Sequence, residues 1–535
     1  MTPRSHGPRP RTLPVPIKAW GMMAAGLLLA VAAVLISSEA LEQALRGQAT
    51  GRLAWGPALF RLLLALHGLA LAILGWWKWQ RPAAAREARG AAPAFSPVVM
   101  ALMGLMTLAA AALRLYRLDS QLWYDEVLTL VECVRLPLGE IVSSFPSQNQ
   151  HMLYSILARF AFDVFGESPW TLRLPAVLFG VLSVWALFAL GAKLANIRTA
   201  LLACALMTFS YHHIWFSQNA RGYTGLLFFA ILATWIWIEA VERDAWNWWM
   251  GYALAVFLGM WVQMTMLFVV AGHGLVFLSM LAWPRCFPHR AGGKAVVAWL
   301  VAGTASLQVY ALSLPEFLHS AAGEVSMPSD WTNPLWLVTE TLRNLTVIPG
   351  GVVAILGGGA VFLLGWWEIF RRDANAAYVM TLPAVICGVT MVALGHNLWP
   401  RFFFFSMGFA LLFVVVGALR LPHLAAVLFG RFKGRELLLT RAGTGIALLL
   451  VAASAATSGK AFLLPKQDFL GAKAYVEQNR ESGDAVVVVG LAAKAYGDYY
   501  APEWRSSNSP AELDEIRHQY RRIWLVYTLP VQLQG

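Results

Sequence analysis

Two adjacent acids, Asp125 and Glu126, follow Trp123 and Tyr124 just after a hydrophobic stretch of the chain. The chain has 535 residues, of which 58% are hydrophobic and only 13% are charged. A carboxylate close to hydrocarbon is costly unless it is paired, solvated or used in chemistry. One interpretation is therefore a catalytic base, since an ionised carboxylate can accept a proton from a reacting group. The alternative is an exposed loop in which both acids are solvated and have no catalytic role.

Arg221 and Arg401 are the cations best placed in the sequence to bind an anion. Arg221 lies in the segment SQNARGY, residues 217–223, and Arg401 ends the segment GHNLWPR, residues 395–401. Each segment adjoins a long hydrophobic run, so both arginines are expected at the mouths of helices. A guanidinium can hold a phosphate through two parallel hydrogen bonds, although it can also simply extend to the lipid headgroups. Acids for proton transfer and arginines for a phosphate together suggest a lipid-phosphate substrate.

Several other polar residues accompany the acids and arginines and are candidates for positioning a substrate. Spacing along a helix would place Gln218 and Arg221 on one side, with Asn219 and Tyr223 beside them. His151 is expected either to orient a substrate or to cap a helix, because histidine serves in many roles. The complete set of predicted positioning residues is Tyr124, His151, Tyr154, Gln218, Asn219 and Tyr223.

Long hydrophobic runs recur along nearly the whole chain, and the mean hydropathy is +0.58. A membrane helix needs ~20 apolar residues to cross a bilayer core about 30 Å thick. The sequence therefore predicts an all-α polytopic membrane protein with about thirteen transmembrane helices. The predicted spans are residues 20–36, 57–77, 96–113, 172–193, 200–216, 222–239, two helices within 248–283, 296–314, 347–367, 378–394, 402–419 and 443–456.

The net charge of +12 comes from Lys and Arg residues that cluster in short loops between the predicted spans. This positive-inside pattern indicates orientation and attraction to membrane lipid rather than to nucleic acid. It places the N-terminus in the cytoplasm and residues 114–170 outside the plasma membrane. There HMLYSILARFAFDVFG (151–166) is expected to form an interfacial or partly re-entrant helix. Four polar clusters would then meet on the outer face, namely Asp125 with Glu126 and residues 148–154, 218–223 and 396–401.

The chain changes in character after its last predicted span. Residues 468–480 are predicted to be helical, and residues 484–490 (DAVVVVG) and 522–527 (RIWLVY) are predicted strands. We therefore expect a small extracytoplasmic C-terminal α/β domain that docks on the membrane part, because so short a segment has a marginal core. The predicted division is 1–95 for two additional N-terminal helices and a basic loop, 96–457 for the catalytic membrane domain, and 458–535 for the α/β domain.

Three stretches of the sequence, taken together, resemble the C-type glycosyltransferase (GT-C) fold. They are RLYRLDSQLWYDE (114–126), the segment 151–184 that begins HMLYSILARF, and SYHHIWFSQNARGYTGLLFF (210–229). Within that fold, the sequence is similar to the bacterial branch of the dolichyl-phosphate-mannose protein mannosyltransferase family, family 39. The resemblance covers about residues 96–420.

The resemblance implies an inverting glycosyltransferase that takes a sugar from a polyprenyl-phosphate donor. The acceptor would be a hydroxyl or amine of a lipid, glycan or protein outside the plasma membrane, and the base would be an acid in the first outer loop. That acid maps onto Asp125, with Glu126 beside it. Arg221 and Arg401 are the candidates for stabilising the charge that develops on the phosphate.

The sequence departs from the family pattern at two places. Many relatives have His-Pro-Pro-Leu where this chain has His151-Met152-Leu153-Tyr154, which removes a rigid turn. Many relatives also carry Glu at the position of Asn219, an acid that sometimes binds a metal in related folds. A divalent cation is therefore left open as a cofactor, and no metal ligand is assigned.

Two other functions are alternative hypotheses. A lipid-linked sugar transporter or flippase would favour acids at mid-membrane and an inverted repeat, whereas here the acids are expected at the outer mouth. A non-catalytic protein that binds a lipid-linked sugar is the other alternative. The acid missing at position 219 is its only support.

Overall fold

The structure is a computed structural model that describes residues 15–80, 95–286, 289, 291–322, 339, 351–395, 398–428, 430, 435–463 and 465–528. The chain divides into two compact units. The first consists of Met1–Phe95, Val142–Phe145 and Leu307–Ala322, and the second consists of Ser96–Ile141, Pro146–Ser306 and Gly323–Gly535. The division predicted from sequence, at residues 95 and 457, stays a prediction.

The first unit is built on two long apolar helices, α1 (Val15–Leu35) and α3 (Gly56–Gln80), with the short α2 (Ser38–Arg46) between them. The two long helices approach closely at glycines, since a Cβ on Gly26 would lie 2.4 Å from the carbonyl oxygen of Gly68. Small residues at such a contact let helix backbones pack tightly in a membrane. The unit also contains α15 (Leu314–Ala322), in which Glu316 forms an ion pair with Arg46 at 3.0 Å.

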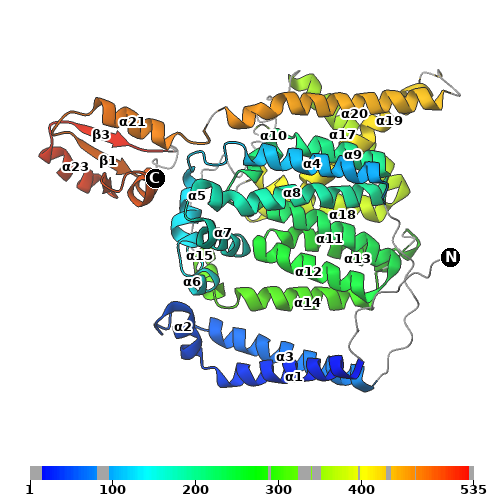
Figure 1. Cartoon of the computed structure of the whole chain (residues 1–535), viewed down its shortest axis with the longest axis horizontal. Helices are drawn as coiled ribbons and strands as arrows, with labels where there is room; N and C mark the ends of the chain where they lie inside the picture. The colour runs from blue at the N-terminus through cyan, green and yellow to red at the C-terminus, as the bar shows by residue number, and fades with distance from the viewer. Residues whose placement is uncertain are drawn as a thin grey trace, which may run out of the picture. The chain divides into compact units, whose positions relative to one another are not determined.

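The second unit contains the remaining long helices, which lie side by side in Figure 1. At its centre is α11 (Tyr223–Arg243), which contacts α8 and α12. Of the most apolar stretch of α11, 83% of the residues are buried. The other helices of this unit are α4 (Pro97–Leu115), α8 (Pro169–Leu194), α9 (Ile197–Thr208), α10 (Tyr211–Ser217), α12 (Trp246–Val262), α13 (Met266–Ala282), η2 (Pro284–Cys286), α17 (Gly351–Arg372), α18 (Ala374–Ala393), η4 (Pro400–Ser406), α19 (Met407–Leu428), α20 (Glu436–Ser458) and η5 (Gly459–Phe462). Helix α14 (Gly293–Tyr310) belongs to this unit up to Ser306 and to the first unit from Leu307 on.

The prediction of a multi-pass helical membrane protein is confirmed. Every predicted span overlaps a helix, and among the described residues eight helices are long and apolar enough to cross a membrane, or up to nine if a bent pair counts as one span. The number thirteen therefore stays a prediction. The predicted start of the span 347–367 lies outside the described residues.

Residues 200–216, which were predicted to form one span, are not one continuous helix. The chain there forms two helices, α9 and α10, with a break around Ser210. The side chain of Ser210 accepts a hydrogen bond from the N–H of His213, which starts the second helix. At 1.5 Å per residue, the 12 residues of α9 extend only about 18 Å, which is short of a bilayer core.

The long segment between α4 and α8 is mostly helical and compact. It contains α5 (Tyr124–Leu128), the π-helical turn η1 (Thr129–Val134), α6 (Leu138–Ser143) and α7 (Met152–Phe165). The helix expected at residues 151–166 is thus confirmed as α7, with 14 residues.

The C-terminal segment forms the predicted α/β domain around a three-stranded parallel sheet, seen in orange and red in Figure 1. Its strands lie in the order β2 (Arg505–Ser507), β1 (Ala485–Val489) and β3 (Ile523–Val526). The central strand is buried, which explains its continuous apolar sequence. The helical elements are α21 (Phe469–Asn479), α22 (Leu491–Ala495), η6 (Tyr496–Tyr500) and α23 (Pro510–Gln519).

The α/β domain shares a hydrophobic core with the segment that carries the acids. Tyr496, Tyr500 and Trp504 of the domain belong to one buried cluster with Leu122 and Val127. Burial of this shared apolar surface stabilises the contact, since a domain this small has little core of its own. The expected docking of the α/β domain on the rest of the chain is therefore seen in the packing.

Candidate active site

Asp125 lies where three separate parts of the chain meet. Its Oδ2 is 2.8 Å from Nη1 of Arg221 and 3.3 Å from Nη1 of Arg401. Asp125 comes from α5, Arg221 from the turn between α10 and α11, and Arg401 from η4. Asp125 is 15% exposed, against 6% for Arg221 and 33% for Arg401. The predicted convergence of the acid with both arginines is therefore observed.

Arg221 is held in place by residues of the segment before α7. Its Nε donates to Nε2 of His151 at 3.1 Å, and Nη1 also contacts Oδ1 of Asn149. Burial lowers the pKa of His151 well below its usual value, and the nearby Arg221 lowers it further, although a hydrogen bond to the backbone of Val262 acts in the opposite direction. His151 is thus a neutral acceptor that orients Arg221, and no capping hydrogen bond from its side chain is seen.

The turn that presents Arg221 requires a glycine at the next position. A Cβ on Gly222 would lie 3.0 Å from the carbonyl oxygen of Val262 and 3.1 Å from Nδ1 of His151. Both distances are tighter than ordinary contacts, so a side chain here would push the turn away from the histidine. Gly222 therefore lets the backbone of Arg221 approach the α12–α13 connection.

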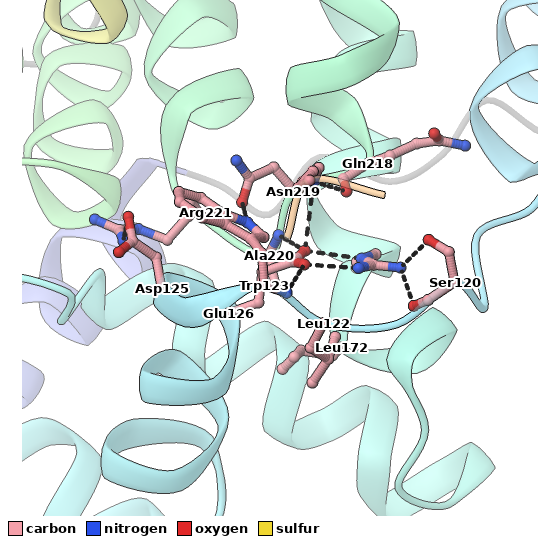
Figure 2. Close-up of polar contacts among 12 residues, drawn as sticks. Ser120, Leu122, Trp123, Asp125, Glu126, Leu172, Gln218, Asn219, Ala220 and Arg221 are labelled. Carbon is pink, nitrogen blue, oxygen red and sulfur yellow. Dashed lines mark hydrogen bonds and ion pairs between the residues drawn. The ribbon is translucent and has the colours of Figure 1, made fainter. Parts of the chain in front are cut away.

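Glu126, the neighbour of Asp125, is fully buried and has a different environment. Its Oε1 accepts hydrogen bonds from Nε of Arg173 and from the backbone N–H of Ala220, both at 2.8 Å. Its Oε2 accepts from Nη2 of Arg173 at 2.6 Å. The same oxygen accepts from the backbone N–H of Trp123 at 3.3 Å (Figure 2). Burial alone would raise the pKa of Glu126, but Arg173, Lys466 and the hydrogen bonds lower it to about 2.

The alternative interpretation, in which both acids are solvated in an exposed loop, is therefore wrong for Glu126. A buried carboxylate whose oxygens already accept four hydrogen bonds is poorly suited to accept a proton from a substrate. Instead it joins the loop before α5, helix α8 and the turn before α11. Its proposed role changes from a second catalytic acid to a structural one.

Two cations that the sequence did not single out, Arg173 and Lys466, neutralise Glu126. Arg173 also donates to the carbonyl oxygens of Leu118 and Ser120, at 2.7 and 2.8 Å, so it holds the chain that leads into α5. Lys466 Nζ is 3.8 Å from Oε1 of Glu126, and burial lowers the pKa of Lys466 to about 7 despite that acid. Arg173 is a charged residue in the first turns of an apolar helix, which is a signal that sequence reasoning can use.

The predicted helical arrangement of residues 218–223 is wrong, because α10 ends at Ser217 and α11 begins at Tyr223. Gln218 donates to the carbonyl oxygens of Arg114 and Tyr116 at 3.0 and 2.6 Å. These bonds fasten the turn to the end of α4, so they leave the amide nitrogen of Gln218 little capacity to position a substrate.

Asn219 and Arg401 each present a buried donor that is without a partner among the described residues. The Oδ1 of Asn219 accepts a hydrogen bond from Nε1 of Trp123 at 3.1 Å, as Figure 2 shows, but its Nδ2 is unpaired. The Nε of Arg401 is unpaired as well. A buried donor without a partner is costly, so both atoms are candidates to bind a ligand oxygen.

The three tyrosines predicted to position a substrate differ in their surroundings. Tyr154 is fully buried and donates to the carbonyl oxygen of Leu172 at 2.6 Å, so it supports the fold. Tyr223 packs under Arg221, whose guanidinium carbon is 5.6 Å from the ring centre. Burial, Glu132 and Asp125 raise the pKa of Tyr124 to about 12, so its hydroxyl stays protonated.

The acids and amides around Asp125 do not fit a divalent cation. Within the described parts of the chain, no group of three or more His, Cys, Asp or Glu side chains is arranged to hold a metal ion. The charge of Asp125 is matched by two guanidinium groups, and the oxygen of Asn219 accepts from Trp123. His396, in the fourth predicted cluster, lies outside the described residues.

Comparisons with known proteins agree with this architecture. Residues 149–312 match the family model described as dolichyl-phosphate-mannose-protein mannosyltransferase. ArnT from Cupriavidus metallidurans in the apo state has a similar structure, with a TM-score of 0.51 and 12% identity, over 82% of this chain and 94% of that one. The same protein bound to undecaprenyl phosphate gives a TM-score of 0.50 and 11% identity, over 81% of this chain and 90% of that one. No curated protein matches the sequence.

An oligosaccharyltransferase from Archaeoglobus fulgidus, in complex with Zn and sulfate, matches with a TM-score of 0.49 and 12% identity, over 77% of this chain and 62% of that one. That likeness is too weak to support an argument. At such low identities, the likeness to ArnT establishes the fold alone. The resemblance seen in the sequence is confirmed: the chain has a C-type glycosyltransferase fold, and its residues 149–312 match the dolichyl-phosphate-mannose-protein mannosyltransferase family model.

Proposed function

We propose that this chain is an inverting glycosyltransferase that moves a sugar from a polyprenyl-phosphate donor to a hydroxyl or amine of a lipid, glycan or protein acceptor on the outer face of the plasma membrane. The observation that carries the proposal is one accessible carboxylate, Asp125, held between two arginines. The match to a mannosyltransferase family model supports the class of reaction. The ArnT structure that contains undecaprenyl phosphate supports the class of carrier.

Asp125 is the proposed base. Its carboxylate accepts the proton of the acceptor as the acceptor oxygen or nitrogen forms a bond to the anomeric carbon of the sugar. The bond from that carbon to the phosphate oxygen breaks on the opposite side, so the configuration inverts and polyprenyl phosphate leaves as an anion. Loss of such a base reduces rates by about 10²–10⁴-fold. No general acid is required, because the phosphate leaves already stabilised.

Arg221 and Arg401 are the proposed binding groups for the phosphate. Fixed positive charge near a leaving group stabilises the negative charge that develops on it. His151 and Asn149 hold Arg221 in a set orientation, which reduces the reorganisation needed when the donor binds. The unpaired Nδ2 of Asn219 is the proposed donor to a sugar hydroxyl or phosphate oxygen.

Both arginines form ion pairs with Asp125, so binding of the donor phosphate and availability of the base are linked. The carboxylate oxygen that contacts both guanidinium groups is less available to a proton of the acceptor while those contacts persist. A donor phosphate that takes over the arginines would free Asp125 to accept a proton. Proton removal from the acceptor is thereby favoured only after the donor has bound.

The proposal is tested first in cells that lack the protein. Mass spectrometry should show an envelope glycan or lipid that has lost one sugar mass, together with accumulation of a polyprenyl-phosphate sugar. That carrier, supplied to the purified protein in liposomes, should lose its sugar to an acceptor extract from the same cells. A carrier that crosses the leaflets with its sugar intact would instead support a flippase, and a carrier that is bound but neither moved nor consumed would support a binding protein.

A further inference from the structure

The segment that connects the last membrane helix to the α/β domain reaches the helix that carries Asp125. The side-chain oxygen of Gln467 accepts a hydrogen bond of 2.7 Å from the backbone N–H of Tyr124, across 343 residues of sequence. Tyr124 is the first residue of α5. The first N–H groups of a helix have no partner within it, so the Gln467 side chain serves as a cap for α5.

Helix α5 depends on such a cap because it has only five residues before the π-helical turn η1. A helix this short is not stable on its own. Its N-cap residue is Trp123, which has no side-chain oxygen to accept a hydrogen bond. One acceptor comes from α5 itself, because Glu126 accepts from the N–H of Trp123, and the other comes from a distant part of the sequence, because Gln467 accepts from the N–H of Tyr124.

The residues on either side of Gln467 in the sequence form hydrogen bonds with the loop before α5 and with the turn before α11. Lys466 Nζ donates to the carbonyl oxygen of Gln218 at 2.6 Å, in the turn that presents Arg221. Asp468 accepts from the side chain of Gln121 at 2.8 Å, and the side-chain oxygen of Gln121 accepts from the N–H of Leu470 at 2.9 Å. Residues 466–470 therefore bridge the loop before α5 and the turn before α11.

The α/β domain itself completes the attachment. The hydroxyl of Tyr500 donates to the carbonyl oxygen of Leu122 at 2.6 Å. Lys494 forms an ion pair with Glu132 at 3.3 Å. These contacts lie on either side of Asp125 in the sequence, so the domain holds the chain both before and after the proposed base.

We propose that the C-terminal α/β domain is a structural part of the active site and that Gln467 is a positioning residue, which holds Asp125 against Arg221 and Arg401 by capping α5. This inference rests on the proposed function only for its effect on sugar transfer. The effect on the arginines can be measured without any transfer, because Asp125 competes with a phosphate for them.

The test is a double-mutant cycle between Gln467→Ala and Asp125→Asn, read out as the affinity of the purified full-length protein for undecaprenyl phosphate. If Gln467 holds Asp125 on the arginines, Gln467→Ala should loosen that contact and tighten binding by about threefold to tenfold. In the Asp125→Asn background the same substitution should have no effect, since non-additivity identifies residues that act through one another. Gln478→Ala, at an exposed position of α21, is the matched control and should match the wild type in both backgrounds.

Unchanged affinity in Gln467→Ala, or an equal change in both backgrounds, would overturn the proposal, because the residue would then act independently of Asp125. Gln467→Glu keeps an acceptor oxygen and should bind undecaprenyl phosphate like the wild type, which separates loss of the cap from general unfolding. Sugar transfer in cells should fall about tenfold or more in Gln467→Ala, because a displaced base is a poor one. If the affinity cycle behaves as expected but no variant changes transfer, the proposed glycosyltransferase reaction fails and the positioning role stands.

Discussion

Replacing Asp125 by Asn is expected to tighten the binding of a polyprenyl phosphate, although it removes the proposed base. One oxygen of Asp125 lies 2.8 Å from Arg221 and 3.3 Å from Arg401. A phosphate that binds the two arginines must displace these contacts. An asparagine has the same shape but no charge, so it competes far less with the phosphate.

The magnitude follows from the two distances. With an effective dielectric constant of about 20, Coulomb's law gives roughly 5–6 kcal/mol for each pair before desolvation is counted. Desolvation removes most of this energy, and the 33% exposure of Arg401 weakens its pair further. A hydrogen bond to a charged group contributes about 1.5–3 kcal/mol net, and tenfold in affinity corresponds to about 1.4 kcal/mol. Asp125→Asn should therefore bind about tenfold to a hundredfold more tightly.

The assay is the binding of undecaprenyl phosphate to purified wild-type and variant protein in nanodiscs, measured at two salt concentrations. Asp163→Asn is a suitable control because Asp163 is an exposed acid on α7 whose partner is Arg159. It removes the same charge without touching the proposed site. Equal or weaker binding by Asp125→Asn, with the control at the wild-type value, would refute the competition between the carboxylate and the phosphate.

Three further predictions follow from the same geometry. Arg221→Lys should weaken undecaprenyl phosphate binding more than Arg401→Lys, because Arg221 is the more buried and its guanidinium also contacts His151; equal effects in a binding assay would contradict this. Arg173 helps to lower the pKa of Glu126 from 4.5 to about 2, so this acid should contribute about 3 kcal/mol of stability above pH 4.5, which is lost as the pH falls towards 2. Glu126→Gln should therefore flatten the dependence of the melting temperature on pH in this range, and an unaltered dependence would contradict the prediction. A cysteine replacing exposed Asp163, in a background without the four native cysteines, should react with an impermeant thiol reagent in intact cells; labelling only after lysis would contradict the outer location of the site.

Topology made the convergence of the site predictable from sequence. Alternating apolar runs and basic loops placed the segments of Asp125, Arg221 and Arg401 on one side of the membrane, and the structure brings their side chains together. The positive-inside distribution carries this information without any knowledge of helix packing. The α/β character of the C-terminal segment was predictable as well, because the strand AVVVV is apolar at every position.

The different surroundings of the two acids could not be predicted from the topology. Asp125 and Glu126 are adjacent in sequence, yet one faces the arginines and the other is buried against Arg173. Neighbouring side chains on a helix point about 100° apart, so which of them is buried depends on what packs against the helix. Here the packing partners are α8 and residue 466.

The contact between the C-terminal segment and α5 could not be predicted from the sequence either, for a related reason. Gln467 and Tyr124 are 343 residues apart, and a glutamine in a polar linker carries no signal of a specific partner. The turn at residues 218–222 was mistaken for helix because its polar residues happen to have helical spacing. In both places tertiary contacts, rather than local sequence, determine the conformation.

The central claim, that Asp125 is the base of a sugar transfer, is tested most directly by complementing cells that lack the protein. Envelope glycans and lipids are analysed by mass spectrometry after expression of the wild type or Asp125→Asn at equal protein levels in the membrane. The wild type should restore the missing sugar, whereas the variant should form it about 10²–10⁴ times more slowly and leave the polyprenyl-phosphate sugar accumulated. Restoration by Asp125→Asn at the wild-type rate would contradict the assignment.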